Sequence, residues 1–158
     1  MTEVVSLQQT YAGQSTCYGC GPANEQGLQI KSFYDAETRV TRAEYLGQPH
    51  QEAFGGFLNG GIVSTLLDCH CNWAALAHAM EELKLQELPC TVTAKLEVSF
   101  LAPTPATESI ELQASVTETD GNKYWVAGAV LFGGKKTATC TACFVAVKPG
   151  HPAYHRWS

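Results

Sequence analysis

The second half of the chain alternates apolar and polar residues with a period of two. In residues 91–100, TVTAKLEVSF, apolar side chains take every second position from Val92 to Phe100. This period predicts a β-strand with one face on a core and the other in solvent. Further strands of this kind are predicted for residues 108–118, 123–132 and 135–147. Glycine-containing turns at 120–122 and 133–134 would join them as an antiparallel meander.

The first half has weaker patterns. Residues 1–26 show no clear period and are predicted to form a loop-like N-terminal segment. Two strands are predicted next, at 28–35 (LQIKSFYD) and at 38–46 (TRVTRAEYL). A glycine-rich stretch, residues 47–58, is predicted to be a long loop.

A long helix is predicted from Asn59 to about Leu83. Asparagine is a favoured N-cap residue, and the residues that follow are apolar on nearly every face of a helix. A helix of this kind is buried. A six-stranded sheet curling around one buried helix satisfies both patterns, so residues 1–158 are predicted to form one α+β domain, with 151–158 as a short C-terminal tail.

Composition and charge narrow the class of protein. The chain has 158 residues, 45% hydrophobic and 16% charged, with a net charge of −5. No basic run is longer than Lys135-Lys136, which argues against a nucleic-acid partner. The opening residues lack a secretory leader, and no apolar run reaches membrane length. Seven cysteines without a secretory signal indicate reduced thiols, so we expect a cytoplasmic protein with no membrane partner.

Several motifs together resemble a known family. The helix opens with NGG from Asn59, an acid, Asp68, stands nine residues after that asparagine, and a strand ends in SFLAP at 99–103. With CYGCGPANEQGLQI at 17–30, these motifs resemble the hotdog-fold thioesterases, and within them the PaaI-like acyl-CoA thioesterases of the phenylacetate pathway. The family motif has His where Asn59 stands, with the same spacing to the acid.

The resemblance implies a hotdog fold and hydrolysis of an acyl-CoA thioester to a free acid and CoA. It implies no metal or redox cofactor. It also implies a homodimer, or a tetramer made of two dimers, with active sites shared between subunits. Two alternatives stay open: a non-catalytic acyl-CoA-binding protein, favoured by the Asn for His change at Asn59, and a dehydratase or hydratase, for which the missing His is unfavourable.

The chemistry of a helix start supports specific roles. The first amides of a helix lack intrahelical partners and lie at the positive end of its dipole, and glycine leaves room for a carbonyl. Gly60 is therefore the predicted oxyanion donor, and Gly61 a substrate contact. A carboxylate in a poorly solvated site is a stronger base, so Asp68 is the predicted base or nucleophile. The simpler alternative is tight packing at the glycines, with Asp68 hydrogen-bonded to Ser64 or Asn72.

Supporting roles are predicted for residues around the helix. The resemblance implies that Thr93 assists the acid and that His50 and Gln51 contact the carbonyl or water. Asn59 would shape the site, and Ser64 is grouped with the substrate contacts. The simpler alternatives are that Thr93 is a solvent-facing strand residue, that His50 and Gln51 lie in a mobile polar loop, and that Asn59 only caps the helix.

Helix geometry favours a shared site. Gly60 and Asp68 are eight residues apart, about 12 Å along a helix axis. One thioester carbon cannot touch both groups of a single chain. We therefore expect the helix start of one subunit to face Asp68 of the other.

The cysteine motifs suggest a metal site, but the positions of two of the cysteines on a strand argue against it. Cys17-x-x-Cys20 and Cys140-x-x-Cys143 together suggest a four-cysteine zinc site. Residues three apart on a strand point to opposite faces, so the second pair cannot bind one ion, and no metal site is predicted. The remaining cysteines are expected to be small core residues: Cys69, Cys71 and Cys90.

Overall fold

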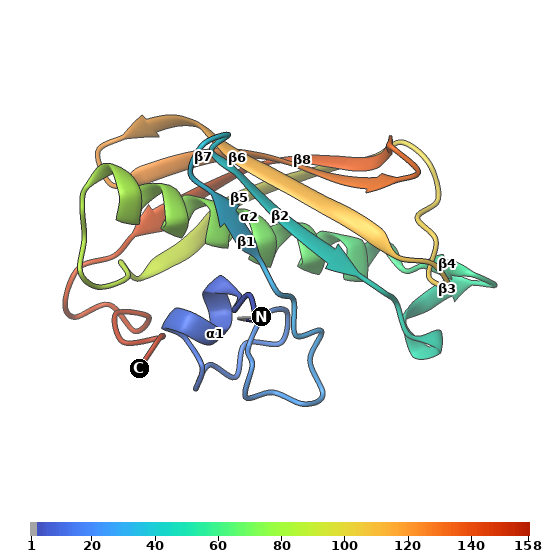
Figure 1. Cartoon of the computed structure of the whole chain (residues 1–158), viewed down its shortest axis with the longest axis horizontal. Helices are drawn as coiled ribbons and strands as arrows, with labels where there is room; N and C mark the ends of the chain where they lie inside the picture. Colours follow the sequence, from blue (N-terminus) through green and yellow to red (C-terminus); the bar gives the residue numbers. More distant parts are fainter. Residues whose placement is uncertain (1–2) are drawn as a thin grey trace.

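One long helix, α2 (Gly60–Glu82), lies across a six-stranded antiparallel sheet in the computed structural model, which describes residues 3–158 (Figure 1). The other elements are α1 (Leu7–Tyr11), β1 (Phe33–Asp35), β2 (Val40–Tyr45), a turn of 3₁₀ helix η1 (Pro49–Gln51), β3 (Glu52–Phe54), β4 (Phe57–Leu58), β5 (Thr91–Phe100), β6 (Ile110–Asp120), β7 (Lys123–Phe132) and β8 (Lys135–Ala146). The large sheet has the order β1-β2-β6-β7-β8-β5, and β3 and β4 form a separate hairpin. The predicted α+β architecture is confirmed.

The core lies between the sheet and α2. The helix buries Leu66, Leu67 and Leu76, and the strands bury Val126 and Phe144 in the same apolar cluster. Each such side chain contributes about 1.5–3 kcal/mol when it leaves water. This burial explains why the helix is apolar on nearly every face.

Gly128 lets the sheet approach the helix closely. A Cβ atom at this position of β7 would lie 2.5 Å from the Cys71 sulfur and 2.9 Å from the Cys140 sulfur. The two sulfur atoms are themselves 3.5 Å apart, one on α2 and one on β8. The expectation that Cys71 is a small core residue is confirmed.

The N-terminal segment covers the side of α2 that faces away from the sheet (Figure 1). His70 of α2 is fully buried there, and its Nε2 donates to the Thr41 carbonyl at 2.9 Å while its Nδ1 accepts from the Ser32 hydroxyl at 2.8 Å. The Gln8 amide donates to the same hydroxyl at 3.0 Å. Burial lowers the pKa of His70 to about 4, so the ring is neutral and this network ties α1 to the helix.

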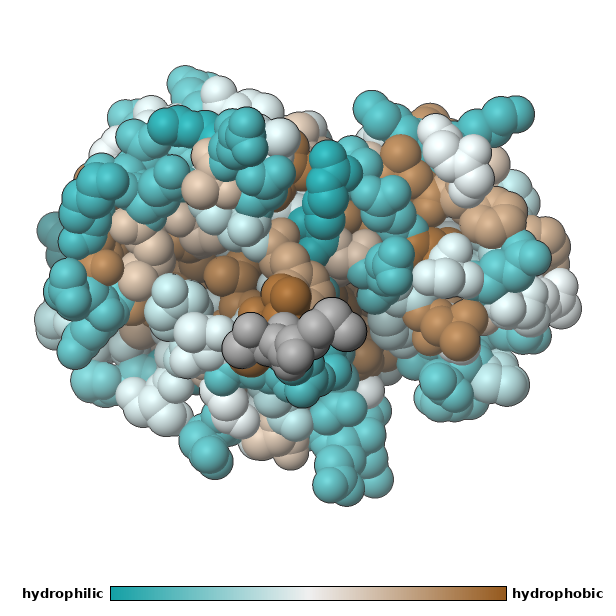
Figure 2. All heavy atoms as spheres, viewed as in Figure 1, coloured by the Kyte–Doolittle hydropathy of each residue, from teal (hydrophilic) through white to brown (hydrophobic). Residues whose placement is uncertain are grey.

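The C-terminal tail also packs on α2. Trp157 lies against Trp73 with ring centroids 5.1 Å apart, and its ring nitrogen donates to the Pro89 carbonyl at 3.0 Å. Figure 2 shows apolar residues in the middle of the face toward the viewer and again in its right-hand part, with polar residues between and around them. The tail is therefore part of the packed structure.

The structure corrects three local predictions in the first half. The predicted N-terminal loop contains α1, which begins with a capping box in which Ser6 and Gln9 bond each other's backbone amides; residues 1 and 2 of that segment lie outside the described residues. The strand predicted at 28–35 is only β1, because Gln29 has a positive φ of 51° that interrupts extended backbone. The loop predicted at 47–58 contains η1 and the β3–β4 hairpin.

A β-bulge in β5 corrects the predicted faces of this strand. Thr93 pairs with Phe144 and Lys95 pairs with Cys143, so Ala94 is an extra residue that the ladder skips. Thr93 consequently faces α2, where its hydroxyl bonds Asp68. The simple alternation, which counted Ala94, places Thr93 on the polar face; the bulge instead turns it to the helix face, although its side chain stays exposed.

Strand β5 is a long edge of the sheet. Within the described residues it pairs with β8 alone, and apolar side chains are exposed at its end, with Phe100 at 56% and Leu101 at 60%. Edges of this length are usually covered or paired.

Among residues 3–158, none of the helices combines the length and apolarity needed to span a bilayer.

Candidate active site

The start of α2 presents one available amide. The Asn59 side chain caps the helix by accepting from the Gly61 amide at 2.7 Å, and its carbonyl accepts from Ile62 at 3.0 Å and Val63 at 3.1 Å. The Gly60 amide has no acceptor among residues 3–158. A free amide at the positive end of a helix dipole is suited to an oxyanion. Gly61 instead has its amide occupied by the cap.

Gly60 lies beneath an aromatic ring. A Cβ atom on Gly60 would lie 3.4 Å from the tip of the Phe100 ring, at the end of β5. The carbonyl of Gly60 accepts from the Ser64 hydroxyl at 2.8 Å. The proton of Ser64 is thus directed at the helix, which leaves only its oxygen lone pairs for a ligand.

Asp68 forms the second part of the site. Its Oδ1 accepts from the Thr93 hydroxyl at 2.7 Å, so a side chain on β5 holds a carboxylate on α2. Burial raises the pKa of the half-buried Asp68, and the Thr93 hydrogen bond offsets part of that rise. A carboxylate with a raised pKa and a fixed orientation can accept a proton or attack a carbonyl.

The packing alternative for Asp68 is not what the structure shows. Ser64 bonds the Gly60 carbonyl, and the Asn72 oxygen accepts from the Thr91 hydroxyl at 2.6 Å. Asp68 is bonded to neither of the two partners that this alternative requires. Its remaining oxygen is available for a ligand.

Gln51 and His50 differ in their surroundings. The buried Gln51 accepts from the Tyr45 hydroxyl at 2.8 Å, and its carbonyl accepts from the Asn59 amide at 2.8 Å. It therefore holds the helix cap in place. His50 is exposed, makes no side-chain hydrogen bond within the described chain, and lines a surface hollow with residues 25–29.

The two halves of the site are separated within one chain. Gly60 and Asp68 lie on one uninterrupted helix, eight residues and about 12 Å apart. The structure brings Asp68 together with Thr93, and Gly60 together with Asn59 and Ser64. It does not bring these two groups together in a single chain.

Two features near Asp68 were missed from the sequence. Arg156 of the tail donates to the Thr91 carbonyl at 2.7 Å, and its charge slightly lowers the pKa of Asp68. No sequence pattern links this arginine to Asp68, because only the fold brings the tail near it. The second feature is Cys69, which lies beside Cys17 and Cys20.

The comparisons with known proteins agree with this architecture. Residues 55–129, which hold Gly60, Asp68 and Thr93, match the model of the Thioesterase superfamily. The structure is similar to a Thioesterase superfamily protein from Shewanella loihica, with a TM-score of 0.68 and 29% identity, covering 90% of this chain and 100% of that one. It also resembles a phenylacetic acid degradation-related protein from Ralstonia eutropha, with a TM-score of 0.66 and 23% identity, covering 80% and 92%.

A curated relative extends the comparison. Acyl-coenzyme A thioesterase THEM4 of Mus musculus is 22% identical over 128 residues, which is 80% of this chain and 51% of the relative. The chain thus spans about half the length of the curated relatives it matches. The resemblance found in the sequence is confirmed: residues 55–129, which hold the candidate site, match the Thioesterase superfamily model, and the chain has the hotdog fold. These similarities support a thioesterase as the class of protein.

Proposed function

We propose that this protein hydrolyses an acyl-CoA thioester to a free acid and CoA. The observation that carries the proposal is the half-buried Asp68, whose pKa is raised by burial and whose carboxylate is held by Thr93. It lies on the same helix that offers the free Gly60 amide. The acyl-CoA activity of THEM4 adds support at low identity.

Asp68 would act on the carbonyl or on water. As a base, it takes a proton from a water whose oxygen bonds to the thioester carbon. The C–S bond then breaks, and the proton passes to the sulfur of CoA. As a nucleophile, it forms an acyl anhydride with loss of CoA, and water then hydrolyses the anhydride. In both routes Gly60 stabilises the oxyanion and Thr93 orients Asp68.

The free edge of β5 supports a shared site. Two copies of β5 placed antiparallel would continue the sheet and cover the exposed Phe100. With Phe100 opposite the partner's Thr93, the Gly60 amide beside Phe100 comes close to the partner's Asp68. We propose a homodimer of this kind, alone or as half of a tetramer.

The remaining candidates have supporting roles in this proposal. Asn59 and Gln51 hold the Gly60 end of the helix through the cap and the bond between them. Ser64 and Gly61 border the thioester there. His50 approaches the substrate only from the outer rim, because it is exposed. The seven free thiols are consistent with a cytoplasmic location, which stays a prediction.

The test is release of CoA from a panel of aliphatic and aromatic acyl-CoA thioesters. At least one thioester should be turned over, and Asp68→Asn should keep the fold but lower kcat at least about a hundredfold. The matched control is Glu118→Gln, which removes an exposed carboxylate on β6, a strand that two others separate from β5.

Two results would contradict the proposal. If Asp68→Asn turns over substrate at the wild-type rate, Asp68 is neither base nor nucleophile. If the wild-type protein binds acyl-CoA tightly but releases no CoA from any member of the panel, it is an acyl-CoA-binding protein.

A further inference from the structure

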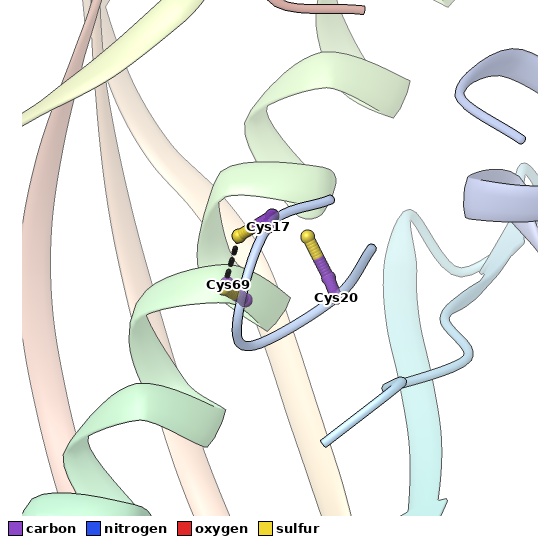
Figure 3. A group of neighbouring side chains, drawn as sticks. All are labelled: Cys17, Cys20 and Cys69. Carbon is purple, nitrogen blue, oxygen red and sulfur yellow. Dashed lines mark hydrogen bonds between the residues drawn. The ribbon is translucent and has the colours of Figure 1, made fainter. Parts of the chain in front are cut away.

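Three cysteine sulfurs converge beside the candidate active site. Cys17 and Cys20 come from the N-terminal segment and Cys69 from α2, and Figure 3 shows the three side chains pointing toward one another. Their sulfur atoms all lie within 4.8 Å of one another, and those of Cys17 and Cys69 are 3.7 Å apart. Sulfur atoms bound to one tetrahedral Zn²⁺ are about 3.8 Å apart, given Zn–S bonds of about 2.3 Å.

The loop that carries the first two cysteines is shaped around these sulfurs. The Gly21 amide closes the turn on the Cys17 carbonyl at 2.8 Å. The Ile30 amide donates to the Gly19 carbonyl at 3.1 Å, so backbone hydrogen bonds fix the turn that carries the two cysteines.

Two further contacts fix the position of the loop. Gly19 packs so closely on Cys69 that a Cβ atom there would collide with its sulfur. The indole nitrogen of Trp73 donates to the Cys20 sulfur at 3.3 Å. The loop and the helix thus hold the three thiols in a fixed arrangement.

The three-cysteine group differs from the ordinary contact between two core thiols that this protein also contains. Cys71 and Cys140 also lie sulfur to sulfur, at 3.5 Å, but they form a pair and are both buried between helix and sheet. In the three-cysteine group Cys17 and Cys69 are only partly buried. Solvent can therefore reach this group and supply a further ligand.

We propose that Cys17, Cys20 and Cys69 bind one Zn²⁺ ion, with water as the fourth ligand. Three soft thiolates favour zinc over hard cations such as Mg²⁺ or Ca²⁺. Among residues 3–158 the group contains no fourth side-chain ligand, which is why water completes the tetrahedron. The ion ties the N-terminal loop to α2 one residue from Asp68.

This assignment differs from the expectation drawn from the sequence. The sequence suggests a site with Cys140 and Cys143, argues against it and predicts no metal site. Those two cysteines do lie on opposite faces of β8: Cys140 contacts Cys71 on the helix side, and Cys143 pairs with Lys95. The third ligand is Cys69, which was expected to be a core residue. Only the fold brings it to the Cys17 loop.

The first experiment measures metal content and spectra in the full chain. Purified in reducing buffer with Zn²⁺, the wild type should hold one zinc per chain. Co²⁺ in its place should show the visible and near-ultraviolet bands of tetrahedral thiolate coordination. Cys69→Ser should weaken zinc binding at least about tenfold, since even outer-shell changes weaken metal binding about 10- to 100-fold. Cys90→Ser, a partly buried thiol outside the group, is the matched control and should bind like the wild type.

A second experiment needs no variant. Zn²⁺ should protect Cys17, Cys20 and Cys69 of the wild type from alkylation, while Cys90 reacts as before, as mapped by mass spectrometry. Reduced protein that binds no zinc, or protection absent from these three thiols, would overturn the proposal. So would a Cys17–Cys69 disulfide whose reduction yields no zinc site. Neither readout uses thioester turnover, so the result is independent of the proposed activity.

Discussion

Asn59 holds the start of α2 through its side chain. Because Asn59 accepts from Gly61, the cap draws the second glycine amide away and leaves the first one free. The family motif has His at this position, whereas here the asparagine side chain caps the helix. The oxyanion donor is a backbone group, so its placement depends on the cap more than on the chemistry of the capping side chain.

We predict that Asn59→His is tolerated. Activity should stay within about tenfold of the wild type, because Gly60 keeps its amide, while the weaker cap should cost about 1 kcal/mol of stability. CoA release and chemical unfolding would measure the two effects. Asn59→Asp, which keeps a capping oxygen, is the control for stability. Loss of all activity in a folded Asn59→His protein would show that the asparagine has a direct role.

At the scale of residues, the sequence alone singles out Asp68 as a candidate, and its catalytic role stays a prediction. A single carboxylate inside an apolar helix has few explanations, and its spacing from the glycines is visible without a structure. The orientation of Thr93 was beyond reach, because the pairing of one residue in the strand depends on a bulge. The cluster around Cys69 was missed for a similar reason: its neighbour Cys17 is 52 residues away in the chain.

At the scale of elements, the distance between α2 and the sheet depends on Gly128. The helix and strand approach so closely there that the Cβ position is taken by the Cys71 and Cys140 sulfurs. The rest of the contact is large apolar side chains, which adapt more easily. Gly128 therefore fixes the spacing of the two layers.

We predict that Gly128→Ala destabilises the protein by about 1–3 kcal/mol, as overpacked cores do. The matched control is Gly55→Ala, since a Cβ there meets nothing within 4 Å. Chemical denaturation of both variants gives the two changes in the free energy of unfolding. Equal stability of the two variants would show that the layers shift freely to make room.

The elements that the sequence predicted well are those with local signals. The turns at Gly121, Gly133 and Gly134 all have positive φ, which is the conformation that glycine favours. The four long strands follow from their period of two, and the helix follows from its Asn59 cap and its long apolar run. The start of the chain was less predictable, because α1 has only five residues and depends on the buried contacts of Gln8.

At the scale of the whole molecule, the site we propose is complete only in a dimer. A mixed dimer tests this directly. One chain carries Asp68→Ala, and the other carries Gly60→Val, whose side chain would press on the Phe100 ring. Each variant alone should be inactive, because every site in its homodimer lacks one group.

Mixing the two variants should restore about a quarter of wild-type activity. Random pairing makes about half of the dimers mixed, and each mixed dimer has one intact site and one site with both changes. Turnover after co-refolding is the measurement, and differently tagged chains show that mixed dimers form. Mixed dimers that remain inactive would mean that both groups act within a single chain.

The bulge in β5 also bears on how this strand tolerates changes in length. Ala94 is left out of the ladder, so its deletion would join Thr93 and Lys95 into a continuous register with both residues still on their present faces. Deleting any other residue of β5 would shift the register by one. All side chains on one side of the deletion would then move to the opposite face of the sheet, unless the bulge moved to that position. The half of β5 that supports Asp68 and the half that covers Gly60 are therefore separated by one dispensable residue. Insertions and deletions in homologues should concentrate at this position, and each half should vary independently during evolution.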